Sequence, residues 1–155
     1  MMVWLEGTAL GVWTRESGSI WSYPTILTLH TVGLGIVVGA SAVVDFRLLG
    51  LAPRIPVPSL TPLFRFIWWA FALNAATGVV LFVSEATDKS RQPVFYIKLG
   101  LIALAVWNTA LVQAIVCRPD ADRPLPDHTR GRRLAAASLC LWAGAIVAGR
   151  LMAYL

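Results

Sequence analysis

Four long, nearly uninterrupted apolar stretches limit what this chain can fold into. They comprise about residues 25–46, 66–84, 94–116 and 134–155. A helix needs about 20 apolar residues to cross a hydrocarbon core of roughly 30 Å, and each stretch is close to that length. Backbone groups cannot stay unpaired in lipid, and continuous runs lack the alternation of barrel strands. The sequence therefore predicts an all-α integral membrane protein, a four-transmembrane-helix bundle.

The composition agrees with a chain that has lipid as its solvent. Charged residues make up 14% of the 155 residues and apolar residues 57%, whereas a soluble domain carries about 25% charged residues. The net charge of +5 could indicate a nucleic-acid partner, but the basic residues sit beside the ends of the apolar stretches. We therefore expect a single membrane domain over residues 1–155, with the lipid bilayer and not nucleic acid as its partner.

The connections between the stretches differ in charge. The first and third connections, with their flanks, hold eight arginines: Arg47, Arg54, Arg65, Arg118, Arg123, Arg130, Arg132 and Arg133. The opposite side holds three basic residues, Arg15, Lys89 and Arg91. Because arginine and lysine stay on the cytoplasmic side, this bias predicts that both termini lie on the periplasmic or extracellular side.

Three shorter patterns predict local structure. Leu5, Ala9 and Trp13 recur at helical spacing, which favours an interfacial amphipathic helix over about residues 3–16. The pair Gly35 and Gly39 is a GxxxG motif, which is typical of closely packed helices. We expect Asp45, at the inner end of the first span, to be ion-paired with a basic residue, such as Arg47, Arg65 or one from the third connection.

Ionisable residues inside a span are costly and are candidates for function. His30 lies six residues into the first span, Lys98 lies near the start of the third, and Arg150 lies near the end of the fourth, all in the outer part of the bundle. His30 is either a hydrogen-bonded neutral imidazole or a haem or metal ligand or proton carrier. Lys98 and Arg150 either extend to the membrane surface or join His30 in holding a cofactor or an anionic group. On the second span, Asn74, Thr77 and Gly78 share a face, which indicates interhelical hydrogen bonds.

The stretches His30-Thr-Val-Gly-Leu-Gly and Asp45-Phe-Arg-Leu-Leu-Gly-Leu resemble a bacterial family of small four-span membrane proteins of unknown function. More distantly, the chain is similar to the J-type haem-binding protoporphyrinogen oxidase and to the membrane domain of copper-resistance protein D. These resemblances imply a bacterial inner-membrane location. The resemblance to the oxidase implies that His30 and Lys98 match its functionally important histidine and lysine, which are associated with haem b.

The chain departs from both better-known patterns. The oxidase has a further histidine in its third span, where this chain has Trp107 and Asn108. A copper path favours several methionine or histidine ligands, and the only methionines are Met1, Met2 and Met152. These departures argue against oxidase activity and against copper.

Three hypotheses of function follow, and no catalytic residue is assigned. The first is a b-type haem protein in redox chemistry or electron transfer, with His30 as metal ligand, Lys98 as second ligand or propionate partner, and Arg150 as a further propionate contact. The second is a cofactor-free accessory subunit of a larger membrane complex, or a homo-oligomer. The third is an enzyme like the protoporphyrinogen oxidase.

Overall fold

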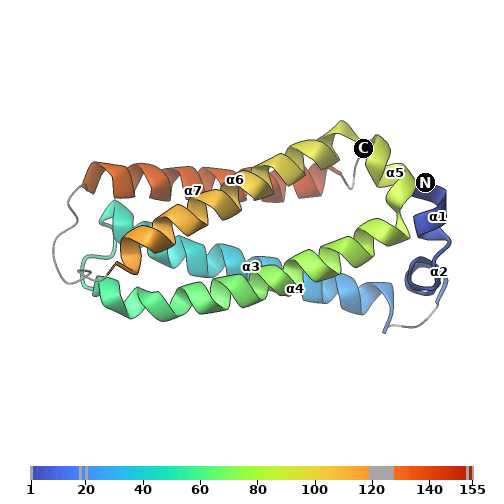
Figure 1. Cartoon of the computed structure of the whole chain (residues 1–155), viewed down its shortest axis with the longest axis horizontal. Coiled ribbons are helices and arrows are strands. Elements are labelled where there is room, and N and C mark those ends of the chain that lie inside the picture. The colour runs from blue at the N-terminus through green and yellow to red at the C-terminus, as the bar shows by residue number, and fades with distance from the viewer. Residues whose placement is uncertain (1, 18, 20, 119–127, 153, 155) are drawn as a thin grey trace.

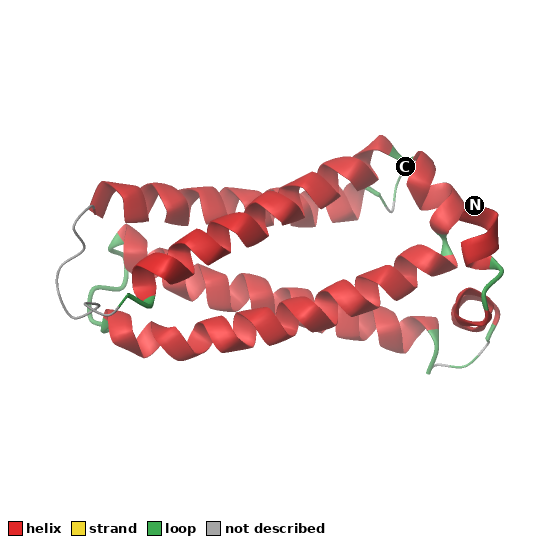
Figure 2. Cartoon of the chain, in the orientation of Figure 1, coloured by secondary structure: helices red, strands yellow, loops and turns green. Residues whose placement is uncertain are grey.

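Four long helices lie side by side in the computed structural model (Figure 1). The structure describes residues 2–17, 19, 21–118, 128–152 and 154. The long helices are α3 (Tyr23–Leu49), α4 (Thr61–Ser84), α6 (Pro93–Val116) and α7 (His128–Leu151), and all four are long and apolar enough to cross a membrane. Figure 2 shows helices and connecting loops, and no strand occurs in the described residues. The predicted all-α bundle of four membrane-spanning helices is confirmed.

The bundle is two helical hairpins packed together. α3 packs extensively on α4 and on α7, and α6 packs on α7, whereas α4 and α6 touch only sparsely. The end with both chain termini also holds α1 (Met2–Glu6), α2 (Ala9–Glu16) and α5 (Ala86–Arg91), and we call it the terminal end (Figure 1). The opposite end holds the short 3-10 helix η1 (Val57–Leu60), the last turn of α6 and the first turn of α7, and we call it the loop end.

Proline and glycine fix where the helices begin and end. Pro24, Pro62 and Pro93 occupy the first turns of α3, α4 and α6, where the missing N–H removes no helical hydrogen bond. Gly50 follows α3 with φ of +89°, a left-handed conformation that glycine adopts without a side-chain clash. The next amide, of Leu51, then bonds back to the Phe46 carbonyl at 3.0 Å, as in a Schellman cap.

Two boundaries differ from the prediction. α7 begins at His128, six residues before the apolar stretch, so Arg130, Arg132 and Arg133 lie in a helix and not in a loop. A helix satisfies its own backbone in water as well as in lipid, so it need not stop where the apolar sequence stops. Arg123, also counted in that connection, lies outside the described residues.

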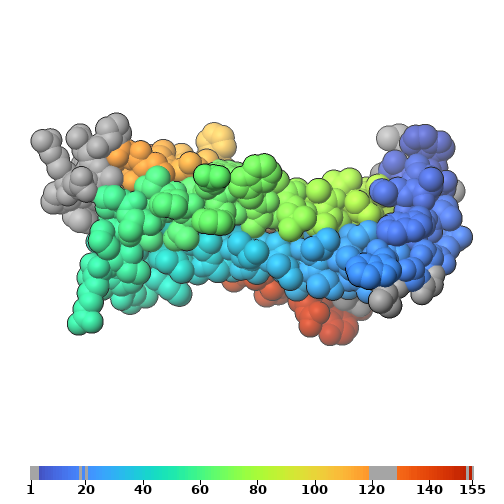
Figure 3. Space-filling view, turned by 90° about the horizontal axis from the view of Figure 1, so that it is seen from below, coloured from blue at the N-terminus to red at the C-terminus, as the bar shows by residue number. Residues whose placement is uncertain are grey.

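The N-terminal segment forms two helices and not one. The chain breaks at Gly7 and Thr8, and the Thr8 hydroxyl accepts a hydrogen bond from the Gly11 amide at 3.3 Å, which caps α2. α2 runs crosswise over the terminal end, where the N-terminal helices gather in the space-filling view (Figures 1 and 3). The predicted single helix over about residues 3–16 is therefore wrong, and the location of this segment at a membrane surface stays a prediction.

One carboxylate ties α1 to α5. The Glu6 side chain accepts a hydrogen bond from the Thr87 backbone amide at 2.7 Å. This bond favours the charged carboxylate, so it lowers the pKa of Glu6 below its ordinary value of 4.5. A lowered folded-state pKa gives stability that is fully present above pH 4.5 and is lost as the pH falls through the folded-state pKa.

We therefore expect α1 to detach from α5 in acid. The hydrogen-exchange protection factor of the Thr87 amide should fall as the pH is lowered below 4.5 in wild-type protein. Glu6→Gln should remove this pH dependence, because an amide does not titrate. Glu16→Gln, on the exposed end of α2, is the matched control and should keep it. A protection factor that does not change with pH in the wild type would contradict the assignment.

Candidate functional site

His30 points from α3 into the contact with α4. Its Nδ1 lies 2.9 Å from the Asn74 carbonyl oxygen and 3.1 Å from the Thr77 hydroxyl oxygen. A carbonyl oxygen can only accept, so Nδ1 must carry the proton. The Thr77 hydroxyl donates its own proton within α4, to the Leu73 carbonyl at 2.8 Å, and therefore also accepts from His30. The predicted interhelical hydrogen bond of Thr77 is confirmed, whereas Asn74 contributes its backbone carbonyl.

This hydrogen bonding determines what the imidazole can offer to a ligand. With Nδ1 protonated, Nε2 of the neutral ring carries a lone pair, and it makes no hydrogen bond within the described part of the chain. A histidine that donates one ring N–H to a carbonyl and keeps the other nitrogen free is the usual arrangement of a metal ligand. The side-chain oxygen of Asn74, beside this site, is buried and also has no partner there.

Gly78 makes room for the ring. A Cβ at this position would lie 3.1 Å from Cε1 and 3.6 Å from Nδ1 of His30. The imidazole therefore rests directly on the α4 backbone, one residue beyond Thr77. His30 thus packs against the face of α4 that holds Asn74, Thr77 and Gly78, and we call this face the seat of His30.

Lys98 approaches from α6 along α7. Its half-buried side chain runs over Gly149, where a Cβ would lie 3.5 Å from Cε and 3.6 Å from Nζ. Lys98 interacts electrostatically with His30, and Lys89 interacts with Lys98. The structure therefore brings two of the three predicted site residues, His30 and Lys98, close enough to interact electrostatically.

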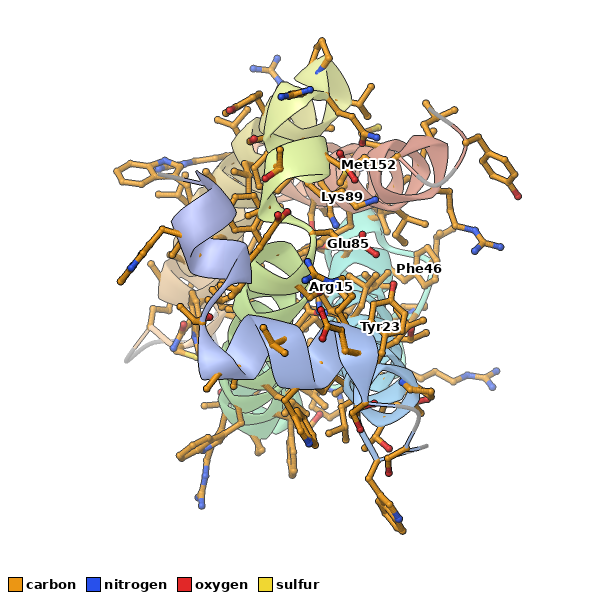
Figure 4. All side chains as sticks on the ribbon, turned by 90° about the vertical axis from the view of Figure 1, so that its right-hand side faces the viewer. Arg15, Tyr23, Phe46, Glu85, Lys89 and Met152 are labelled. Carbon is orange, nitrogen blue, oxygen red and sulfur yellow. The ribbon has the colours of Figure 1, made fainter. Side chains whose placement is uncertain are left out.

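Further charged residues close to Lys98 lie at the surface of the terminal end. Lys89 pairs with Glu85 at 3.4 Å, and Tyr23 interacts electrostatically with Glu85. Figure 4 looks onto this end and shows Glu85 and Lys89 next to each other, with Tyr23 on the same side of the bundle. A run of basic groups thus leads from Lys89 at the surface through Lys98 to His30.

Arg150 does not join His30 and Lys98. It is exposed on α7, next to Gly149, and no ion pair or hydrogen bond of its side chain occurs in the described residues. Adjacent helical positions point about 100° apart, so the glycine faces Lys98 while Arg150 faces outward.

Two predictions about α3 do not hold within the chain. A Cβ added at Gly35 or Gly39 would meet no atom of another helix within 4 Å, so this pair does not pack within the chain. The close contact is at Gly33, whose added Cβ would lie 3.2 Å from the Ala70 carbonyl oxygen on α4. Asp45 is 1% exposed, and no ion pair involves it in the described residues. Its side chain faces the core and not the basic surface, because the rotation of α3 turns it inward.

The surroundings of Asp45 are not predicted from the sequence. Its carboxyl lies among buried hydroxyls of three helices: Ser41, Thr109 and Ser138. The available signals were the spacing of Ser41 and Asp45, one turn apart, and a hydroxyl residue inside each of two other apolar stretches. Neither signal predicts that the four residues meet.

Comparison with known proteins gives no relative from which a function could be transferred. No family model matches the chain, and neither a curated protein nor a solved structure matches it. What the site can do therefore follows from its own chemistry.

The seat of His30 can be tested by filling it. Gly78→Leu should displace the imidazole and lower the stability by about 1–3 kcal/mol, the usual range for overpacking. The thermal midpoint in detergent should fall, and the nitrogen NMR shifts of His30 should lose the Nδ1–H pattern. Gly100→Leu, where an added Cβ meets nothing within 4 Å, is the matched control and should leave both unchanged. Equal effects of the two variants would contradict the packing of the His30 imidazole against Gly78.

Proposed function

We propose that this chain is a multi-pass protein of a bacterial inner membrane that binds b-type haem at His30 and acts in redox chemistry or electron transfer. The observation that carries the proposal is the hydrogen bond of His30 Nδ1 to the Asn74 carbonyl, which leaves Nε2 as a ligand lone pair. The predicted orientation, with the terminal end outside, is part of the proposal and rests on the arginine bias.

The donor set fits this group. The protein holds the imidazole in one tautomer and one orientation, which are the two properties that a metal-ligating histidine needs. Haem iron bound there would supply one-electron chemistry. Lys98 would serve either as the second ligand or as the partner of a propionate, and its ammonium group favours the propionate role because it would attract a carboxylate. Arg150 would contribute only from its exposed position on α7.

The test is an absorption spectrum of detergent-purified protein expressed with ample haem, first oxidised and then reduced with dithionite. We expect a Soret band and sharp reduced α and β bands, and their loss in His30→Ala. His128→Ala, which removes the only other histidine, is the matched control and should leave the bands in place. A featureless wild-type spectrum, or an unchanged spectrum in His30→Ala, would exclude haem at this site.

Lys98→Ala separates the two roles of Lys98. If Lys98 ligates iron, the band positions change. If it holds a propionate, the bands stay and haem binds about 10- to 150-fold more weakly, because a charge-assisted hydrogen bond contributes about 1.5–3 kcal/mol.

A second candidate function is a subunit that packs in the membrane against another helix. The observation that favours it is the unpacked GxxxG pair, since Gly35 and Gly39 are both accessible on α3. Small residues let two helices approach closely in lipid, where packing and not the hydrophobic effect drives association. The partner is either a second copy of this chain or a larger complex.

Filling this face should abolish the association. We expect Gly39→Leu to dissociate a wild-type oligomer or complex, observed as a smaller species by native electrophoresis or crosslinking in membranes. Gly100→Leu is the matched control, because Gly100 is exposed on α6 with nothing within 4 Å of an added Cβ. Association that survives Gly39→Leu would exclude this face.

A further inference from the structure

A small cavity, lined by both polar and apolar side chains, lies in the half of the bundle nearer the loop end, away from His30. It has a volume of about 10 Å³, and its lining residues come from all four long helices: Ser41, Val44, Asp45, Phe64, Ile67, Thr109, Val112 and Ser138. That volume is about the smallest that holds one water-sized ligand. We call it the Asp45 cavity.

Four oxygen-bearing side chains surround this space, and all are at least nine-tenths buried. Asp45 and Ser138 are each 1% exposed, Thr109 is 4% exposed and Ser41 is 5% exposed. Such burial of a carboxyl and three hydroxyls in an apolar bundle is costly unless each finds a partner.

Apart from the Ser41 hydroxyl, which keeps both its proton and its lone pairs, the hydrogen bonds already made leave lone pairs open. The Thr109 hydroxyl donates to the Ala105 carbonyl at 2.8 Å, so its oxygen can only accept another contact. The Ser138 hydroxyl is a hydrogen-bond partner of the Asp45 carboxyl and donates to it when the carboxyl is ionised. Within the described residues, the second carboxyl oxygen of Asp45 and the Ser41 hydroxyl oxygen have no partner. The open positions of the cavity are thus mainly electron-rich oxygens.

No basic side chain is among the described residues that line the Asp45 cavity, so none balances the carboxyl there. The α3 lining contributes Ser41 and Val44 besides Asp45, and the α4 lining is Phe64 and Ile67. The α6 and α7 lining adds only valine and hydroxyls. The cavity therefore lacks both a positive charge to balance the Asp45 carboxylate and hydrogen-bond partners for Asp45 and Ser41 among the described residues.

We propose that the Asp45 cavity binds one alkali-metal cation, held by the Asp45 carboxylate and the hydroxyl oxygens of Ser41, Thr109 and Ser138. Hard cations take oxygen ligands, and one carboxylate balances one positive charge. Calcium and magnesium fit less well, because their sites use more ligands and usually more carboxylates or retained waters than this cavity provides. The cation serves as the counter-charge of Asp45 and joins α3 to α6 and α7. The proposal does not depend on haem binding at His30.

The test compares thermal unfolding of the purified full chain in sodium, potassium and choline chloride at equal ionic strength and about pH 7.5, where a cation-bound carboxyl is ionised. Choline is too large for the cavity, so it serves as the reference. We expect one or both alkali ions to raise the midpoint saturably, by about 4 °C at a tenfold excess over the dissociation constant. Whichever ion acts at the lower concentration is the preferred ligand.

Variants link this effect to the Asp45 cavity. Asp45→Asn keeps the shape of the side chain but removes the charge, and it should abolish the salt-specific rise. Ser41→Ala removes one neutral ligand and should raise the half-saturating concentration about fivefold, as expected for a contact of about 1 kcal/mol. Asp88→Asn, on the exposed face of α5, is the control and should behave as wild type. If Asp45→Asn does not fold, two other measurements test cation binding in the Asp45 cavity. They are the half-saturating concentration of Ser41→Ala and the binding of radioactive sodium to the wild type.

Two outcomes would overturn the proposal. Equal midpoints in the three salts, with no bound radioactive sodium, would mean that the cavity holds only water. A stability that depends on pH through Asp45 but not on the alkali ion would mean that a proton, and not a metal cation, neutralises the carboxyl.

Discussion

The absence of water inside a bilayer is the constraint on which the rest of this structure depends. Every polar group within the four helices must find its partner in the protein or in a bound ligand. Two polar side chains find their partners on other helices. The Asn108 side chain donates to the Leu134 carbonyl at 3.0 Å. The Trp68 indole donates to the Gln113 side chain at 2.7 Å. These two bonds are complete within the chain and hold neighbouring helices together. His30 and Asp45 differ, because each keeps an atom without a partner in the described residues after its protein contacts are made. An unpartnered lone pair on an ionisable side chain makes these two residues the candidates for ligand binding.

The two candidate sites are opposite in chemistry because of the residues that converge on them. Toward the terminal end, Lys98 interacts with the imidazole of His30, which favours an anionic ligand. Toward the loop end, a carboxyl is surrounded by hydroxyl oxygens, which favours a cation. Both sites are seated on α3, and both use small or hydroxyl-bearing residues of neighbouring helices to make room. A glycine at position 78 and serines at 41 and 138 are therefore as much a part of the sites as the ionisable residues.

The sequence predicts the class of fold well, because helix length and apolarity are properties of each segment by itself. It also singles out His30 and Lys98, because an ionisable residue in an apolar run is conspicuous. It fails where a property depends on which helix faces meet. The GxxxG pattern predicts close packing at Gly35, whereas Gly33 makes the contact. Two residues correspond to a rotation of about 200°, so Gly33 and Gly35 lie on nearly opposite sides of the helix. Proximity in sequence predicts that Asp45 pairs with arginines, although the rotation of α3 turns it to Ser138 on α7.

The spacing of the two sites limits how strongly they can influence each other. His30 and Asp45 are fifteen positions apart on one helix, or about 22 Å along its axis. Two unit charges at that distance interact by roughly 0.8 kcal/mol at an effective dielectric constant of about 20, which is about fourfold in an equilibrium constant. A cation beside Asp45 cancels most of this interaction, because the pair then acts as a dipole. The charge at one site therefore changes the affinity at the other only severalfold, and each site can be studied without disabling the other.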